Sequence, residues 1–191
     1  MMFYGMFFFD YFCRMMKETI VEDKNQLFYY SLYASLILGV YWVIKYLIII
    51  LGKDYAITSL IANFLSIGTP LILMYFLVIY NKWYNENEMS FLHGIQFSIL
   101  MFFFASIIEA IAVFIHVNWI DTMFISNFYS SIVELAESLK LSPALTEQLA
   151  EQQLPSSFSY VLNNIILGDV FIGLLLSLII VPLARTVSQK I

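Results

Sequence analysis

Four long runs of apolar residues dominate the pattern along the chain. They cover residues 27–51, about 56–80, 91 to about 117, and 158 to about 183. A transmembrane helix needs about 20 mostly apolar residues, so each run is long enough to cross a bilayer. The runs are apolar on nearly all sides, as is typical of helices that face lipid. Transmembrane strands would be near ten residues long with alternating polarity, so the pattern predicts helices.

The segments between the runs differ in length. Residues 52–55 are predicted to form a tight turn, and residues 81–90 a polar loop in which Ser90 is placed to cap the third helix. Residues 118–157 form a much longer segment in which Ser142 and Pro143 have the order expected at a helix start. Two apolar stripes at helical spacing flank this pair. Their members are Ile125, Phe128, Ile132, Leu135 and Leu139, and then Leu145 and Leu149.

The long segment is therefore predicted to be an amphipathic helical hairpin that lies on the membrane surface or over the bundle. The alternative is a partner-binding arm. A packed cap is favoured, because each stripe is narrow and needs a surface to cover it. The predicted fold class is an all-α membrane protein, with four transmembrane helices and an external hairpin between the third and the fourth. The transmembrane domain covers residues 27–183, including the external loop 118–157.

Basic residues predict the orientation. With a cytoplasmic leader (1–26) and a cytoplasmic tail (184–191), six basic residues lie inside and only Lys53 and Lys140 lie outside. This agrees with the excess of Lys and Arg in cytoplasmic loops. Both termini are therefore predicted to be cytoplasmic and loop 118–157 periplasmic. The six inner residues are Arg14, Lys17, Lys24, Lys82, Arg185 and Lys190.

The start of the chain has an unusual composition. Residues 1–15 (MMFYGMFFFDYFCRM) contain an apolar run that is too short to span, and its positive charges follow the run instead of preceding it. A signal peptide has the opposite order. We expect translation to start at Met15 or Met16, and an interfacial anchor is the alternative.

Composition supports a membrane protein and excludes several other classes. Hydrophobic residues make up 61% and charged residues 12% of the 191 residues, against about 45–50% and about 25% in soluble domains. A chain of this size has too little interior to hide so much apolar surface. The net charge of −5, without a basic tract, makes nucleic acid an unexpected partner. The single cysteine, Cys13, excludes a disulfide framework within one chain.

Three ionisable residues, Lys45, Glu109 and Asp169, fall within the predicted spans. Such residues are costly in lipid and usually face the bundle interior in pairs. At about 1.5 Å per residue, Lys45 and Glu109 lie roughly 9 Å and 12 Å below the same end of their helices. We expect them to pair, with Asp169 completing a polar cluster. A proton or ion relay is one interpretation. A structural pair that fixes helix register, or a lysine that extends toward the interface, is favoured over it.

Other residues offer less chemistry. Pro70 is expected to kink the second helix, because proline removes a backbone hydrogen bond. His93 and His116 are 23 residues apart on one helix, about 34 Å, which is too far to share a metal. No phosphate-binding loop or catalytic pair is present in the sequence, so neither an enzyme nor a cofactor or metal site is expected.

Three stretches carry a resemblance to a known family. They are MSFLHGIQFSILMFFFASIIEAI with the following HVNWIDTMFI, the insert containing LSPALTEQL, and the closing ILGDVFIGLLLSLIIVPLAR. Together with the layout they resemble the bacterial inner-membrane family named domain of unknown function 4199, over about residues 16–190. The resemblance implies four helices in the bacterial inner membrane. It implies no activity and supplies no functional residues.

Two functional hypotheses follow. The first is a non-enzymatic accessory or scaffold protein in which the acidic hairpin contacts a protein partner. The second is a small transporter or ion-coupled protein that uses Lys45, Glu109 and Asp169. The second would act as a homo-oligomer, because four helices enclose little room. A shared, water-accessible cavity at the three charged residues would favour transport, whereas dry pairing would favour the scaffold.

Overall fold

The computed structural model describes residues 26–52, 56–84, 89–150 and 152–190. The predicted leader therefore lies outside the described residues, apart from its last position. In the described part the chain is helical and contains no strand. The helices are α2 (Gln26–Leu51), α3 (Ala56–Ser66), α4 (Gly68–Tyr84), α5 (Phe91–Ile115), α6 (Phe124–Ser138), α7 (Pro143–Ala150), α8 (Ser157–Tyr160) and α9 (Gly168–Ser188), with π-helical segments η1 (His116–Ile120) and η2 (Val161–Leu167).

Four helical segments are long and apolar enough to cross a membrane, which confirms the predicted all-α fold with four transmembrane helices. They are Gln26–Leu51, Asn63–Trp83, Phe91–Ile120 and Ser157–Ser188. The protein is therefore a multi-pass membrane protein. The last two spans end later than the apolar pattern predicted, because the third continues through the π-helical segment η1 to Ile120 and the fourth continues into the predicted tail. Helix α9 also continues to Ser188, so most of the predicted tail is helical.

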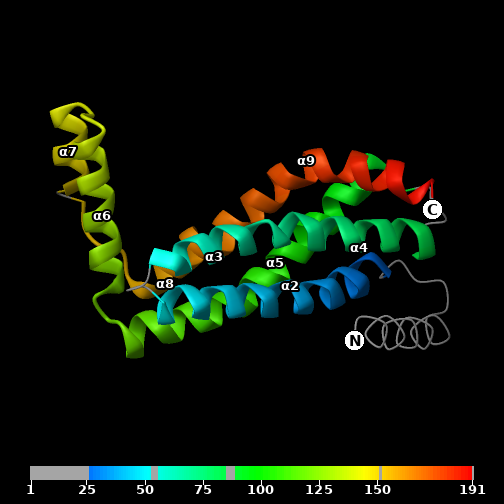
Figure 1. Ribbon diagram of the computed structural model, residues 1–191, viewed down its shortest axis with the longest axis horizontal. Helices are drawn as coiled ribbons and strands as arrows, with labels where there is room; N and C mark the ends of the chain where they lie inside the picture. The colour runs from blue at the N-terminus through cyan, green and yellow to red at the C-terminus, as the bar shows by residue number, and fades with distance from the viewer. Residues whose placement is uncertain (1–25, 53–55, 85–88, 151, 191) are drawn as a thin grey trace.

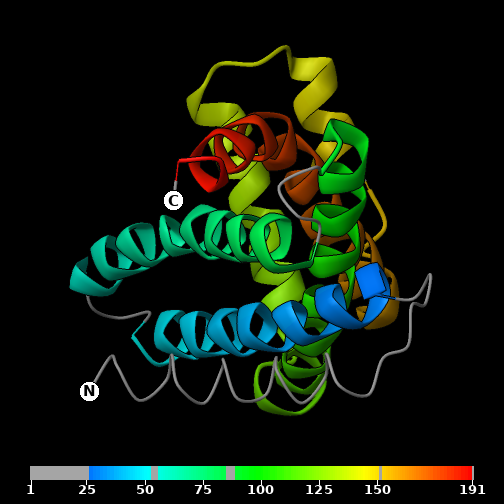
Figure 2. The ribbon, with the colours of Figure 1, turned by 90° about the vertical axis from the view of Figure 1, so that its right-hand side faces the viewer.

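The spans run antiparallel and form an elongated bundle (Figure 1). The terminal end of the bundle is where α2 and α5 begin and where α4 and α9 end. The hairpin end is the opposite one, next to α6. Helix α5 packs against both α2 and α9, and α4 packs against α9. Figure 2 shows the bundle from the terminal end, with the hairpin reaching past α9.

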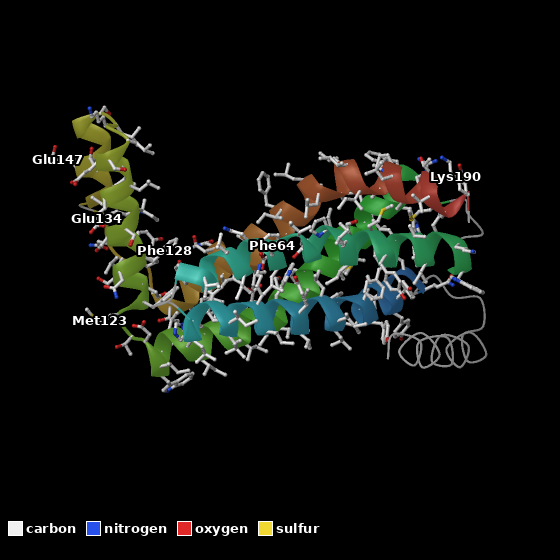
Figure 3. All side chains as sticks on the ribbon, in the orientation of Figure 1. Phe64, Met123, Phe128, Glu134, Glu147 and Lys190 are labelled. Atoms are coloured by element: carbon white, nitrogen blue, oxygen red, sulfur yellow. The ribbon has the colours of Figure 1, made fainter. Side chains whose placement is uncertain are left out.

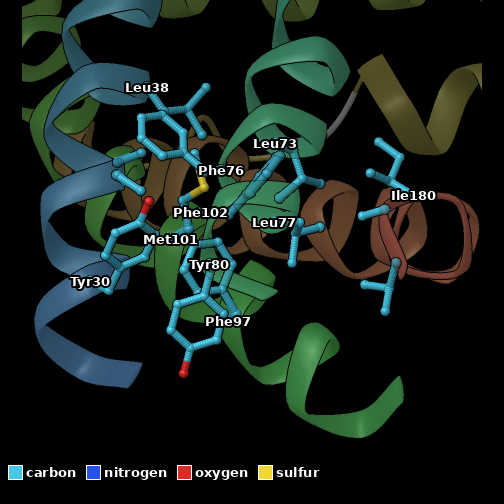
Figure 4. Close-up of a cluster of buried hydrophobic side chains, with 14 of the residues drawn as sticks. Tyr30, Leu38, Leu73, Phe76, Leu77, Tyr80, Phe97, Met101, Phe102 and Ile180 are labelled. Carbon is cyan, nitrogen blue, oxygen red and sulfur yellow. The ribbon is translucent and has the colours of Figure 1, made fainter. Parts of the chain in front are cut away.

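The largest apolar core lies in the terminal half of the bundle (Figure 4). Tyr30, Tyr80 and Phe97 form its aromatic centre, with ring centroids 4.9–5.8 Å apart. Asn81 is fully buried beside this centre. It accepts a hydrogen bond from the backbone N–H of Met89 and donates one to the Ser188 hydroxyl. These bonds join α4 to the start of α5 and to the end of α9. Ser90 caps α5 as predicted, by accepting a bond from the His93 N–H.

The second span is divided at Ile67, between α3 and α4. Pro70 lies in the first turn of α4. Because proline has no backbone N–H, it cannot donate a hydrogen bond to a carbonyl of the preceding helical turn. The Tyr41 hydroxyl donates a hydrogen bond to the Leu65 carbonyl, and Trp42 Nε1 donates one to Thr69 Oγ1 at 3.0 Å. Helix α2 therefore supports the break that is associated with Pro70.

Helices α6 and α7 form a hairpin that runs crosswise to the spans at the hairpin end (Figures 1 and 3). Aromatic contacts hold its base. Phe124 packs edge-on against His116, with ring centroids 5.3 Å apart, and Phe128 packs against Tyr160 at 5.7 Å. Farther along α6 the predicted apolar stripe is uncovered, because Leu135 and Leu139 are 58% and 64% exposed. The outer part of this stripe, at Leu135 and Leu139, therefore covers no part of the bundle.

Candidate functional site

The structure brings Lys45, Glu109 and Asp169 together from three different spans. Glu109 on α5 and Asp169 on α9 form a side-chain hydrogen bond, and the charge of Lys45 on α2 acts on both carboxyl groups. Their meeting follows from the helix order, since α5 packs between α2 and α9. We call these three residues the charged cluster.

The charged cluster is partly enclosed. All three residues are intermediate between buried and exposed. The Oδ2 atom of Asp169 is buried and receives no hydrogen bond from any donor in the described part of the chain. Its neighbour is the Glu109 carboxyl. An ionised carboxylate only accepts hydrogen bonds, so a bond between two carboxyl groups requires a proton on one of them.

A tyrosine–histidine pair lies beside the charged cluster, toward the hairpin end. The Tyr46 hydroxyl is hydrogen-bonded to Nδ1 of His116 at 2.8 Å, and their rings meet edge-on at 5.6 Å. His116 is only 4% exposed. The charges of Glu109 and Asp121 both act on the Tyr46 hydroxyl, and so does Tyr160. The Tyr46 hydroxyl is therefore close enough to feel the charge of Glu109, in the charged cluster, and that of Asp121, the first acidic residue beyond the span.

Sequence reasoning missed this pair, because it considered His116 only as a metal ligand. A signal was present. Tyr46 directly follows Lys45, and His116 lies seven residues after Glu109, which is two turns along the same helix face. This signal is weak, because His116 lies roughly 10 Å farther along its helix than Glu109 whereas Tyr46 lies only one residue from Lys45, so depth along the helices does not by itself pair Tyr46 with His116.

Both π-helical segments adjoin these residues. Segment η1 begins at His116 and is closed by a bond from the Asp121 N–H to the His116 carbonyl, 2.9 Å long. Segment η2 packs against α5 and ends at Leu167, two residues before Asp169. Single π-helical turns within α-helices are frequent at functional sites, because the extra residue redirects side chains. Here they occur in the two helices that supply the carboxyl pair.

A second tyrosine–histidine pair lies at the terminal end. The Tyr80 hydroxyl is bonded to Nε2 of His93, also at 2.8 Å, and their rings are stacked 5.6 Å apart. The two histidines thus stand at opposite ends of α5, as the sequence spacing predicted. Among the described residues no group of three or more His, Cys, Asp or Glu side chains is placed to hold a metal.

The arrangement is suited to holding charge and protons inside an apolar bundle. It contains a cation, two carboxyl groups that share a hydrogen bond, and a hydroxyl bonded to an imidazole. Pro70 belongs to a separate feature, the break in the second span that Tyr41 and Trp42 support.

Comparison with known proteins gives one match. Neither the curated proteins nor the solved structures include one that matches this chain. The family described as Protein of unknown function (DUF4199) matches residues 33–185, a range that includes the second and third spans, most of the first and fourth, the charged cluster and the hairpin. The chain therefore belongs to the DUF4199 family.

Proposed function

We propose that the protein is a non-enzymatic accessory or scaffold protein of the bacterial inner membrane, and that its α6–α7 hairpin contacts a protein partner. The observation that carries the proposal is the position of the hairpin. It is anchored at its base by Phe124 and Phe128 and extends past the side of the bundle (Figures 2 and 3). An element that packs mainly on itself contributes little to the bundle and is available to another molecule.

The two faces of the hairpin differ in polarity. Phe128 lies on the side of the bundle, whereas Glu134 and Glu147 point away from it (Figure 3). On α6 the residues Phe128, Leu135 and Leu139 share one face, and Glu137 lies on the opposite one. Since the hairpin runs crosswise to the spans, its apolar face is directed at the bilayer surface. An amphipathic element in this position suits the interface, with its acidic face turned to water.

Basic residues support a periplasmic hairpin. In the described part of the chain, Lys82, Arg185 and Lys190 lie at the terminal end, while Lys140 lies in the hairpin. The rule that places Lys and Arg on the cytoplasmic side then assigns the terminal end to the cytoplasm. The partner would meet the acidic face of α6 in the periplasm and would present basic groups to it.

The experiment is site-specific photocrosslinking in living cells. A photoreactive residue at Glu134 is expected to capture a discrete protein, whereas the same residue at Leu71, which is 64% exposed on α4, is expected to contact lipid. The variant Glu137→Lys should weaken the capture at Glu134 by charge repulsion. The matched control Lys190→Glu, at the terminal end, should leave it unchanged. Lipid capture alone at Glu134 would contradict the proposal.

A second candidate function is ion-coupled transport through the charged cluster. The observation that favours it is the gathering of Lys45, Glu109 and Asp169 from three spans. Its test is ion flux into vesicles that contain the purified protein. Flux that is lost in Glu109→Gln, and kept in Glu134→Gln on the hairpin, would place transport ahead of the scaffold role.

A further inference from the structure

We propose that Glu109 and Asp169 form a proton-binding site inside the bundle, in which the two carboxyl groups hold one proton between them and Lys45 supplies the counter-charge. The inference is independent of the scaffold role of the hairpin. It concerns what the charged cluster binds. The proposed ligand is a proton, and one proton is bound per protein chain.

The two carboxyl groups, Glu109 on α5 and Asp169 on α9, are hydrogen-bonded to each other. Two carboxylates offer four acceptor positions and no donor, so they repel each other at bonding distance. One proton removes the repulsion and creates the donor. The buried Oδ2 of Asp169 reinforces this conclusion, since no N–H or O–H group of the described residues reaches it. Asp169 therefore relies on the Glu109 carboxyl for its bond.

Charge balance within the cluster also requires one proton. A membrane-embedded group of side chains is most stable when its net charge is zero, because lipid does not solvate an excess charge. Lys45 contributes one positive charge, and two ionised carboxylates would contribute two negative charges. Binding one proton leaves one ammonium, one carboxylate and one neutral carboxyl group. The cluster is then neutral without any further ligand.

The cluster also needs a route to water. Lys45, Glu109 and Asp169 act on one another, and the groups that act on the nearby Tyr46 hydroxyl are Glu109 on α5, Asp121 after η1 and Tyr160 on α8. His116 in η1 is hydrogen-bonded to Tyr46. The bonded pair Tyr46–His116 lies between Glu109 and Asp121. We assign it as the path by which the proton exchanges with the hairpin end.

The test counts protonated carboxyl groups by infrared spectroscopy of the full chain in lipid at neutral pH. The carbonyl stretch of a neutral carboxylic acid is separate from that of a carboxylate and shifts in deuterium oxide. Each variant changes the number of protons that neutrality requires. We expect one protonated group in the wild type, none in Glu109→Gln or Asp169→Asn, and two in Lys45→Met.

These counts distinguish a proton shared by Glu109 and Asp169 from a proton that one of the two carboxyl groups binds independently of the other. In the second case only one of the two amide variants would lose the band, and that result would overturn the proposal. Absence of the band in the wild type would overturn it without any variant. In each of the three variants the expected number of protonated carboxyl groups differs from that of the wild type, so any variant that folds tests the proposal. Glu134→Gln, on the exposed face of α6, is the control and should keep the wild-type band.

The route is tested by the rate of deuterium exchange at the same band. Tyr46→Phe removes the hydroxyl that bonds His116, so exchange should be slower than in the wild type while the proton count stays at one. Tyr80→Phe removes the hydroxyl of the equivalent pair at the terminal end, and the exchange rate should be unchanged. Equal rates in the two variants would overturn the assigned route.

Discussion

The two ends of helix α5 carry the same pair of side chains in different surroundings. Tyr80 and His93 at the terminal end, and Tyr46 and His116 at the hairpin end, are each joined by a hydrogen bond of 2.8 Å. The terminal pair is stacked and continues into the aromatic core through Phe97. The hairpin-end pair is edge-on and lies within the field of Glu109 and Asp121.

The difference shows that the chemistry of a pair depends on what surrounds it. At the terminal end the polar groups are satisfied locally, and apolar packing fills the rest of the space. At the hairpin end the polar groups continue from one span to the next, and two π-helical segments interrupt the regular helices. We therefore assign apolar packing mainly to the terminal half, and electrostatic stabilisation and proton chemistry to the hairpin half. Four predictions test this division.

The largest effect is expected when both carboxyl groups of the charged cluster are removed. The double variant Glu109→Ala with Asp169→Ala leaves the charge of Lys45 inside a span without a nearby negative charge, and an uncompensated charge within a span costs about 2.5–3.5 kcal/mol. Glu109→Ala alone should cost less, since Asp169 still faces Lys45. Unfolding of the inserted protein in mixed micelles measures the difference. A double variant no less stable than Glu109→Ala would contradict a role for these charges in holding the bundle.

The next effect concerns how tightly each half is packed. A Cβ atom added at Gly94, in the terminal half, would lie 2.5 Å from Val181 Cγ1, whereas one added at Gly168 would meet no atom nearer than 3.8 Å. Gly94→Ala should therefore lower the free energy of unfolding by about 1–3 kcal/mol through overpacking. Gly168→Ala should be neutral or slightly stabilising, because alanine is the better helix former. Similar losses at both positions would mean that the two halves are equally packed.

The two tyrosine–histidine pairs provide a finer test. Losing a hydrogen bond costs about 0.5–1.5 kcal/mol, and more when a buried group is left without a partner. His116 is buried and His93 is half-buried. Tyr46→Phe should therefore destabilise the protein more than Tyr80→Phe, although the two bonds have the same length. The measurement is the midpoint of unfolding of each variant, and the reverse order would contradict the division.

The smallest effect is expected in the hairpin. Glu137→Gln changes an exposed side chain on the outer face of α6, and such substitutions usually change stability by less than about 0.5 kcal/mol. The variant should unfold like the wild type. A large loss of stability would mean that the acidic face of α6 packs against another part of the protein, and it would contradict the hairpin's proposed availability to a partner.

Local features of the sequence predicted a large part of this fold. Hydropathy predicted four spans, because each helix in lipid needs its own apolar run regardless of its neighbours. The spacing around Ser142 and Pro143 predicted a helix start, and α7 begins at Pro143. The ends of the last two spans were placed too early, since η1 continues past the polar Asn118 to Ile120 and α9 continues past the charged Arg185 to Ser188.

The candidate site was only partly predictable. Depth along each helix indicated that Lys45 and Glu109 approach each other, and single charges in lipid need partners. The bond between Tyr46 and His116 joins residues that are 70 positions apart. Depth alone does not say which faces of two helices meet, because the spans are apolar nearly all round.

The sequence by itself thus determined that the chain is a four-span membrane protein, with three ionisable residues in its spans and an amphipathic segment before the last one. These features depend on the composition of single segments, and a bilayer selects segments by composition and length. Only the tertiary structure decided that α5 lies between α2 and α9, that Glu109 bonds Asp169, and that the outer part of the stripe on α6 stays uncovered. Those outcomes depend on the rotation and order of packed helices, which are set by side-chain contacts between distant parts of the chain.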